Sequence, residues 1–94
     1  MSVEFEINLY EQKVELLKAL AHPVRLCIVK NLLQDGGCNV SHMEECLEVS
    51  QSVVSQHLTK LKAAGIVKGK RQGNEIFYEV ANEEVKAIIT ALFK

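Results

Sequence analysis

The apolar residues in the first third of the chain recur at the spacing of amphipathic helices. This pattern predicts a helix over residues 9–21, with Asn8 as its N-cap and Glu11 completing a capping box. A second helix is predicted over residues 23–34, because Pro23 suits the first helical position, where its missing N–H costs nothing. Two consecutive glycines mark the end of this helix. Its core-facing side is predicted to carry Val24, Cys27, Ile28, Leu32 and Leu33.

A short helix, a tight turn and a longer helix are predicted next. Ser41 is placed to begin the short helix, and Ser50 is placed to cap the longer helix over residues 51–64. Residues 48–50 separate the two, which is the sequence form of a helix-turn-helix. The apolar side of the short helix is predicted to comprise Met43, Cys46 and Leu47.

The longer helix has two distinct faces. The stripe expected to face the core comprises Val54, Leu58 and Leu61. The second face comprises Ser52, Ser55, Gln56 and Thr59. A solvated helix face would favour Glu and Lys, whereas Gln and Ser match the hydrogen-bonding edges of bases in the major groove. Lys60 and Lys62, toward the end of the helix, suit the flanking phosphates.

The hydrophobic period changes from helical to extended after Gly65. Residues 66–68 and 76–80 are predicted to be strands, and residues 69–74 between them form a basic tip rich in turn residues. We interpret this hairpin as a wing. Asn82 is placed to cap a last, strongly apolar helix.

The net charge of −1 conceals an uneven distribution. Residues 49–74 contain five basic residues and no acidic one, whereas the rest of the chain carries all 12 acids and six of the 11 basic residues. One cationic zone on an otherwise acidic chain is typical of a phosphate-binding face. A solvated basic surface is the alternative.

The composition is that of an ordinary globular chain, with 48% hydrophobic and 24% charged residues, and we expect one domain over residues 1–94. The sequence has neither an apolar run of about 18 residues nor the pattern of a secretory signal, so we expect a cytoplasmic protein with no membrane partner. Phosphate-binding loops, nucleophile elbows and zinc-protease motifs do not occur either. We therefore expect neither an enzyme nor a cofactor.

The first and last helices are more apolar than a small helical core needs. The surplus comprises Leu9, Leu16, Ile89, Leu92 and Phe93. We expect these helices to pair with a second copy, which would set two recognition helices about one DNA turn apart. The alternative is that they wrap the core of a monomer.

Three segments carry patterns that occur together in one known family. Residues 19–26, ALAHPVRL, are similar to its signature across the first two helices, and residues 52–58, SVVSQHL, are similar to its recognition helix. Arg71, Gly73 and Tyr78 match its wing. Over roughly two-thirds of its length, the chain thus resembles the ArsR/SmtB repressors.

This resemblance implies a winged helix-turn-helix, mainly α-helical with a β-hairpin wing, that dimerises through its first and last helices. It also implies a repressor that covers a palindromic promoter site. Many members of the family release DNA when a metal ion, or oxidation of a thiol, changes the geometry of the dimer.

The chain departs from this family at the positions of its sensors. The family's site on the third helix starts with two cysteines, or a cysteine and an aspartate, where this chain has Asn39 and Ser41. Its site on the last helix begins at positions that Asn82 and Glu84 hold here. A persulfide-sensing branch has a cysteine at the position of Lys30. The comparison therefore implies no metal at these sites, and a repressor without metal or small-molecule sensing is an alternative.

The three cysteines are the remaining candidate sensors. Cys38, His42 and Cys46 follow one another at four-residue intervals, and two thiolates with an imidazole suit Zn²⁺ or Cu⁺. Cys38 precedes the predicted helix, however, so we do not expect the three to share a face, and the prediction is no metal. A thiol switch that uses two of Cys27, Cys38 and Cys46 is one alternative, and three ordinary thiols are another.

The sequence therefore predicts a DNA-binding transcriptional regulator that recognises double-stranded operator DNA as a homodimer. The predicted DNA-binding residues are Gln51, Ser52, Ser55, Gln56, Thr59, Lys60, Lys62, Lys70, Arg71, Gln72 and Asn74. A winged helix used as a protein-interaction module is the alternative, because a fold does not fix a function. Such a module would more often expose an apolar or mixed-charge surface in place of the acid-free segment.

Overall fold

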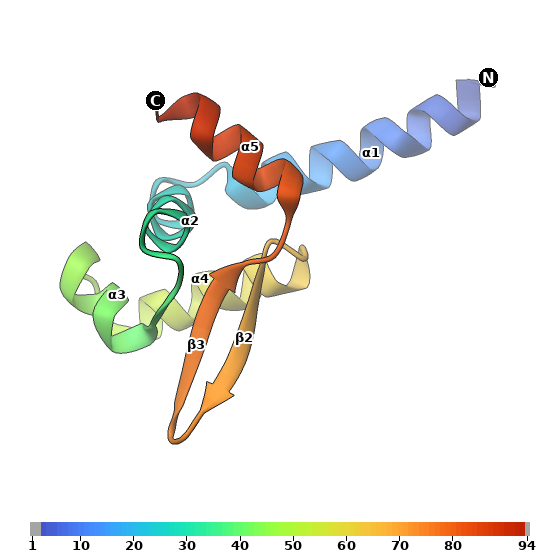
Figure 1. Cartoon of the computed structure of the whole chain (residues 1–94). Coiled ribbons are helices and arrows are strands. Elements are labelled where there is room, and N and C mark those ends of the chain that lie inside the picture. The colour runs from blue at the N-terminus through green and yellow to red at the C-terminus, as the bar shows by residue number, and fades with distance from the viewer. Residues whose placement is uncertain (1–2, 94) are drawn as a thin grey trace.

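The computed structural model describes residues 3–93, in which five helices accompany a small antiparallel sheet (Figure 1). The helices are α1 (Val3–Leu20), α2 (Pro23–Asp35), α3 (Val40–Leu47), α4 (Gln51–Ala63) and α5 (Glu83–Leu92). The strands are β1 (Cys38–Asn39), β2 (Val67–Gln72) and β3 (Glu75–Val80). The predicted class, mainly α-helical with a β-hairpin wing, is confirmed.

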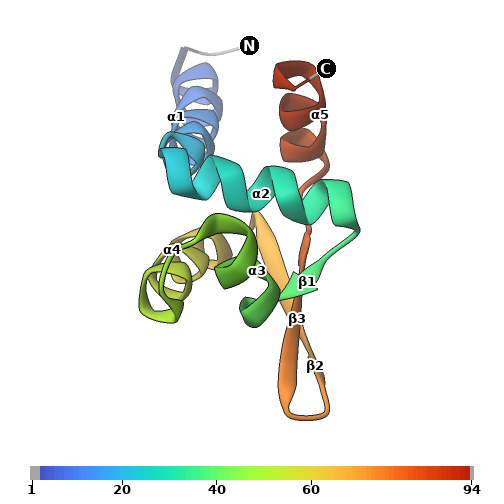
Figure 2. The same cartoon turned by 90° about the vertical axis from the view of Figure 1, so that its left-hand side faces the viewer.

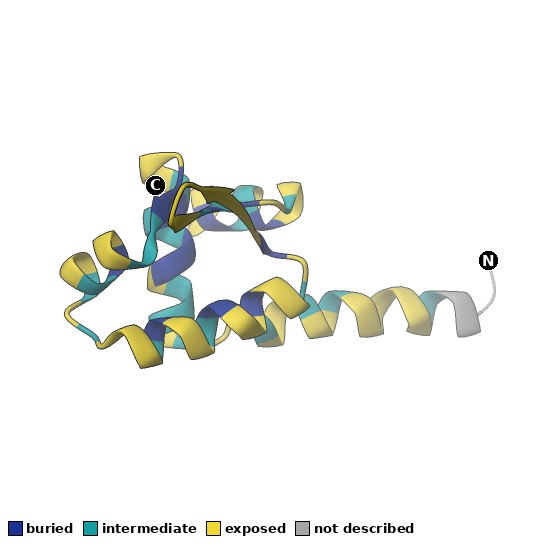
Figure 3. Ribbon diagram, turned by 90° about the horizontal axis from the view of Figure 1, so that it is seen from below, coloured by how far each residue is buried: buried dark blue, intermediate teal, exposed yellow. Residues whose placement is uncertain are grey.

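Helix α1 begins earlier than predicted and projects from the body of the molecule (Figures 1 and 3). It starts at Val3, so Asn8 lies inside the helix and its predicted role as N-cap is wrong. Asn inside a helix costs less than about 1 kcal/mol, which the backbone hydrogen bonds of the added turns offset. Across residues 3–93, no helix has the length and the apolar character that crossing a membrane requires.

Helices α3 and α4 form the predicted helix-turn-helix, and residues 48–50 join them (Figure 2). Ser50 caps α4 as predicted, because its hydroxyl accepts a hydrogen bond from the Val53 N–H at 3.3 Å. The predicted start of α3 at Ser41 is wrong. Asn39 caps this helix instead and accepts from the His42 N–H at 2.9 Å. Asn is as good an N-cap as Ser, and it stands where the chain leaves the extended conformation of β1.

The sheet joins the wing to the helix-turn-helix (Figure 2). Strand β3 lies in the centre, with β2 on one side and β1 on the other. The first wing strand was predicted to end at residue 68, but β2 continues to Gln72. The residues at its outer end are polar and show no apolar alternation, yet they pair with β3. Strand β1 was not predicted, since two residues carry no periodic signal. Its pairing of Cys38 with Tyr78 ties the base of the wing to the start of α3.

Gly37 permits the close approach of β1 to β3. Its φ of +119° lies in a region that side chains disfavour. A Cβ at this position would also lie 2.5 Å from Cε1 of Phe77 and 2.8 Å from the backbone oxygen of Tyr78. Glycine is therefore required both for the conformation and for the space.

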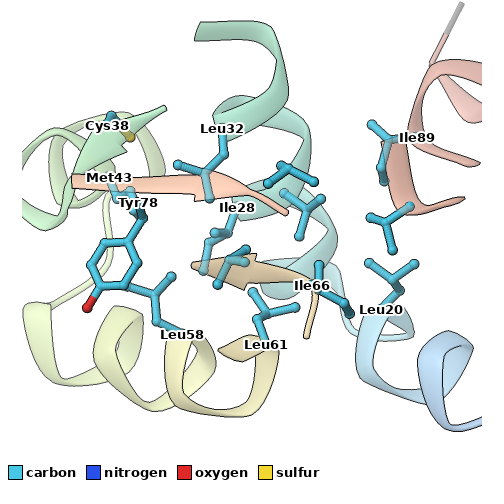
Figure 4. Close-up of a cluster of buried hydrophobic side chains, with 14 of the residues drawn as sticks. Leu20, Ile28, Leu32, Cys38, Met43, Leu58, Leu61, Ile66, Tyr78 and Ile89 are labelled. Carbon is cyan, nitrogen blue, oxygen red and sulfur yellow. The ribbon is translucent and has the colours of Figure 1, made fainter. Parts of the chain in front are cut away.

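The core lies between the helices and the sheet (Figure 4). Its buried apolar residues are Leu20, Ile28, Val29, Leu32, Cys38, Met43, Val54, Leu58, Leu61, Ile66, Val67, Tyr78, Val80, Val85 and Ile89. Cys27 and Cys46 are exposed, so their predicted places on apolar faces are wrong. In α2 and α3, the side chains that face the core include Ile28 and Met43, which are larger than cysteine.

The core also includes part of the apolar surplus of the first and last helices. Ile89 is 2% exposed, and Leu16 packs against the core as a partly buried residue. The expected place of Ile89 in a dimer surface is wrong, because it completes the core of the monomer instead. The open alternative, that these helices wrap the core, thus holds for Ile89, whereas Leu16 keeps part of its surface exposed.

Candidate nucleic-acid interface

Helix α4 presents its predicted polar face to solvent. The opposite face buries Val54, Leu58 and Leu61, which fixes the rotation of the helix. The side chains predicted to bind DNA are all exposed: Gln51, Ser52, Ser55, Gln56, Thr59, Lys60, Lys62, Lys70, Arg71, Gln72 and Asn74. Thr59 also donates a hydrogen bond from Oγ1 to the carbonyl of Ser55 at 2.9 Å, so its hydroxyl can offer a ligand only acceptor capacity.

The start of α4 and the tip of the wing meet at one hollow. Gln51 and Asn74 both line this space of about 240 Å³, although they are far apart in the sequence. The first turn of α4 contains no acidic residue, so the positive end of the helix dipole is uncompensated there. Glu75 also lines the hollow, and its carboxylate accepts a hydrogen bond from Asn39 Nδ2 at 3.1 Å. The structure therefore brings two predicted contact residues together.

The wing has two unlike faces, because successive residues of a strand point to opposite sides. On one face, Gly69 and Arg71 of β2 pair with Tyr78 and Ile76 of β3. Tyr78 is buried and its ring lies beside Leu58 of α4 (Figure 4). This face therefore turns toward α4, and Arg71 lies on the same side of the wing as the recognition helix.

The ring of Tyr78 links the wing to α4. Lys62 Nζ lies 6.0 Å from the ring centre, at the outer limit of a cation–π contact. A Cβ at position 69 would lie 3.1 Å from Cε1 of Tyr78 and 2.8 Å from Cγ2 of Ile76. Gly69 therefore gives the ring the space to lie this close to β2.

The other face of the wing carries a charge cluster that the sequence did not predict. Glu79 Oε1 lies 3.3 Å from Lys68 Nζ and 3.1 Å from Lys70 Nζ. Hydrogen bonds from Lys70 and then Lys68 hold the pKa of Glu79 below its usual range. Lys70 thus shares its charge with a carboxylate, whereas no carboxylate of residues 6–93 forms a salt bridge with Arg71.

Two histidines connect α4 to the corner between α1 and α2. His22 Nδ1 accepts a hydrogen bond from the Val24 N–H at 3.1 Å and so caps α2. The ring centres of His22 and His57 lie 4.5 Å apart. The contact therefore joins the N-terminus of α2 to the middle of the recognition helix.

Arg25 completes this corner, and its role was not predicted from the residue pattern. Its Nε donates to the carbonyl of Ala19 at 2.7 Å, and its Nη1 lies 3.5 Å from His57 Nδ1. Partial burial, followed by the charges of His22, Arg25 and Lys60, lowers the pKa of His57. The corner is thus arranged around a neutral imidazole.

The candidate sensor residues do not form one site. Cys38 is buried in β1, and burial, followed by the charges of Asp35 and Cys46, raises its pKa to about 11. A thiol with so high a pKa is a poor nucleophile at neutral pH. Cys46 Sγ lies 3.4 Å from His42 Nε2, and Cys27 is exposed elsewhere on α2. Across residues 3–93, no three His, Cys, Asp or Glu side chains are grouped so that they could hold a metal ion.

Known proteins share both the sequence and the fold. A family model described as a helix-turn-helix domain matches residues 20–70. The transcriptional repressor PagR of Bacillus anthracis is 44% identical over 82 residues, which cover 87% of this chain and 82% of PagR. The transcriptional repressor SmtB of Mycobacterium tuberculosis is 47% identical over 75 residues, which cover 80% of this chain and 55% of that repressor. This chain belongs to the ArsR/SmtB family.

A solved structure confirms the architecture that membership in the ArsR/SmtB family implies. The homodimeric winged helix-turn-helix DNA-binding domain of Mb0332 from Mycobacterium bovis matches with a TM-score of 0.84 and 28% identity. The match covers 98% of this chain and 83% of that one. The protein is therefore a winged-helix DNA-binding transcriptional regulator and not an enzyme.

The residues at the ArsR/SmtB sensor positions have structural roles in this chain. Asn39 caps α3, and Asn82 caps α5 by accepting from the Val85 N–H at 3.0 Å. Glu84 pairs with Lys13 of α1 at 2.7 Å. Caps and an ion pair thus hold the helix ends at which the resemblance implied the family's sensor sites.

Proposed function

We propose that this protein is a repressor that binds a palindromic operator as a homodimer in the cytoplasm, with residues 1–94 as one DNA-binding domain. The observation that carries the proposal is the surface formed by the polar face of α4 and the Arg71 face of the wing. No acidic residue occurs in α4 or β2, so this surface attracts a polyanion.

The residues of this surface have separate tasks. Gln56 and Ser55, in the middle of the exposed face of α4, read base edges in the major groove. Lys60 and Lys62 contact the flanking phosphates. Arg71 supplies the main phosphate contact of the wing, because it lies on the side of α4 and forms no salt bridge with a carboxylate of residues 6–93.

An apolar stripe on α1 supplies the dimer surface. Ile7, Tyr10, Val14 and Leu17 recur at helical spacing and are between 45% and 65% exposed. Leu92 at the end of α5 is 61% exposed. Both helices lie at the end of the molecule opposite the wing tip (Figures 1 and 2). Two copies that bury this surface about a twofold axis direct both α4 helices toward one DNA duplex.

Selection of bound duplexes from a random library tests this proposal. We expect enrichment of an inverted repeat whose half-sites are about 10 base pairs apart, centre to centre. On the selected site, measured by fluorescence anisotropy, Gln56→Ala should cost about 1–3 kcal/mol of discrimination against random DNA.

The matched control is Gln12→Ala, because Gln12 is an exposed glutamine on α1 and does not belong to the exposed face of α4. This variant should discriminate as the wild type does. A pool without enrichment would contradict operator binding and favour the protein-interaction module. An inverted repeat that the Gln56→Ala variant reads unchanged would contradict only the role of Gln56.

A further inference from the structure

A cavity of about 440 Å³ lies between α2 and α5. It is lined by Lys30, Leu33, Gln34, Ile89, Thr90 and Phe93. Its volume falls in the range of about 300–1,000 Å³ that small-molecule sites occupy. Because α5 lies at the opposite end of the molecule from the wing tip, the cavity is remote from the proposed DNA surface (Figure 1).

The lining of this cavity is amphipathic. Leu33, Ile89 and Phe93 supply apolar surface, and Ile89 belongs to the buried core, so it forms a rigid floor. Gln34 and Thr90 add polar groups. Thr90 Oγ1 donates its proton to the carbonyl of Lys86 at 2.8 Å and keeps its acceptor capacity. A ligand here needs an apolar body and a polar end.

The positive charge of Lys30 favours a ligand whose polar end is negatively charged. Its Nζ lies 5.1 Å from the ring centre of Phe93, a cation–π distance. Five basic side chains of residues 6–93 form no salt bridge with a carboxylate of that range. They are Arg25, Lys30, Lys60, Lys62 and Arg71. Arg25 bonds to Ala19 and contacts His57, and the last three lie at the proposed DNA surface. Lys30 alone of these five stands in the α2–α5 cavity, and its ammonium group pairs with no carboxylate of residues 6–93.

We propose that the α2–α5 cavity binds a small amphipathic carboxylate. The carboxylate pairs with the Lys30 ammonium group, and the apolar chain lies on Leu33, Ile89 and Phe93. A phosphate of nucleic acid would leave this apolar surface unused, and a neutral lipid would leave Lys30 without a partner. The inference does not rest on the proposed repressor function, because it concerns a different end of the molecule.

A nuclear magnetic resonance titration of the ¹⁵N-labelled full chain with sodium octanoate, at constant ionic strength and without DNA, tests the proposal. We expect saturable shifts of the amides of residues 30–34 and 89–93. Octan-1-ol should bind more weakly, and octyltrimethylammonium should give no saturable shift there. Lys30→Gln should weaken octanoate binding at least about tenfold, because it removes a charged hydrogen-bond donor.

Two further variants separate the charge of Lys30 from a general effect of mutation. Lys30→Arg should retain octanoate binding, and so should Lys18→Gln, which removes an exposed lysine from α1. Lys30→Gln should leave octan-1-ol binding unchanged, which shows that the cavity remains folded. The proposal is overturned if octanoate gives no saturable shift at these residues, if octan-1-ol binds as tightly, or if Lys30→Gln binds octanoate like the wild type. None of these results depends on DNA binding.

Discussion

The end of the molecule formed by α4 and the wing exposes hydrogen-bonding and cationic side chains, whereas α1 at the other end exposes large apolar ones. The lysines of the two ends differ too. Lys13 and Lys18 of α1 pair with carboxylates, but Lys60 and Lys62 of α4 form no salt bridge within residues 6–93. Unpaired cations beside neutral polar groups suit a polyanion, and an apolar stripe suits a second copy of the chain. Each end thus shows by its exposed residues which kind of partner it suits.

The largest expected effect comes from making the apolar end polar. Val14→Lys combined with Leu17→Lys should convert the dimer to a monomer, because it places charges in the stripe of α1. Operator binding should then weaken about a hundredfold or more, since the two half-sites are no longer bound by linked subunits. Sedimentation velocity and fluorescence anisotropy measure the two effects.

The matched control for that double variant is Asn8→Lys. It adds a lysine to an exposed position on another side of α1 and should remain dimeric. A Val14→Lys/Leu17→Lys protein that sediments as a dimer would show that the stripe does not join the subunits.

A smaller effect should separate the two faces of the wing. Arg71→Gln should weaken binding to all DNA sequences and lower the slope of log affinity against log salt by about one unit. Lys70→Gln should change the slope less, because Glu79 already neutralises part of that charge. Anisotropy titrations at several salt concentrations compare the two variants. A larger change for Lys70→Gln would reverse the assignment of the faces.

Removal of the carboxylate of Glu79 tests the same difference between the two faces of the wing. Glu79→Gln frees Lys68 and Lys70 and should raise the affinity for any DNA roughly threefold at low salt. Lys70→Gln should then cost more in this background than in the wild type, which a double-mutant cycle measures. The control Glu83→Gln removes the same charge on α5 and should leave DNA binding unchanged. Additive effects of the Glu79 and Lys70 substitutions would argue against the coupling.

The smallest expected effect concerns the corner between α1 and α2, where His22, Arg25 and His57 meet. The pKa of His57 is lowered in the folded state, so the unfolded chain takes up the proton first as the pH falls. The contribution of His57 to stability is therefore complete above the ordinary pKa of about 6.5 and is lost as the pH falls through the folded value. The Tm of the wild type should fall between pH 7.5 and pH 5.5 more steeply than that of His57→Gln. Equal slopes for wild type and His57→Gln would refute the role of the corner.

The sequence predicted those elements whose signals are local. The bounds of α4 follow from the Ser50 cap and the stripe of Val54, Leu58 and Leu61, and the structure retains all four roles. The turn over residues 48–50 was predicted for the same reason. The polar face of α4 could also be found, because burial of one stripe determines which residues remain outside.

Features that depend on distant residues could not be predicted in this way. Pairing with β3 decides the length of β2, and its residues from Gly69 to Gln72 lack any alternation of their own. The neutralisation of Lys70 depends on Glu79, which lies beyond the acid-free segment. The cavity beside Lys30 exists only because α5 packs near α2. Each of these features requires the tertiary fold before it can be recognised.

Strand β1 ends at Asn39, opposite Phe77, so β3 has neighbours on both sides only near the base of the wing. Farther out, a ribbon of two strands continues to the turn at Gly73. Amide hydrogens should therefore exchange slowly near Val80 and rapidly near Ile76. A hairpin with a stiff root and a pliable tip can follow the changing width of a DNA groove without disturbing the helix beside it.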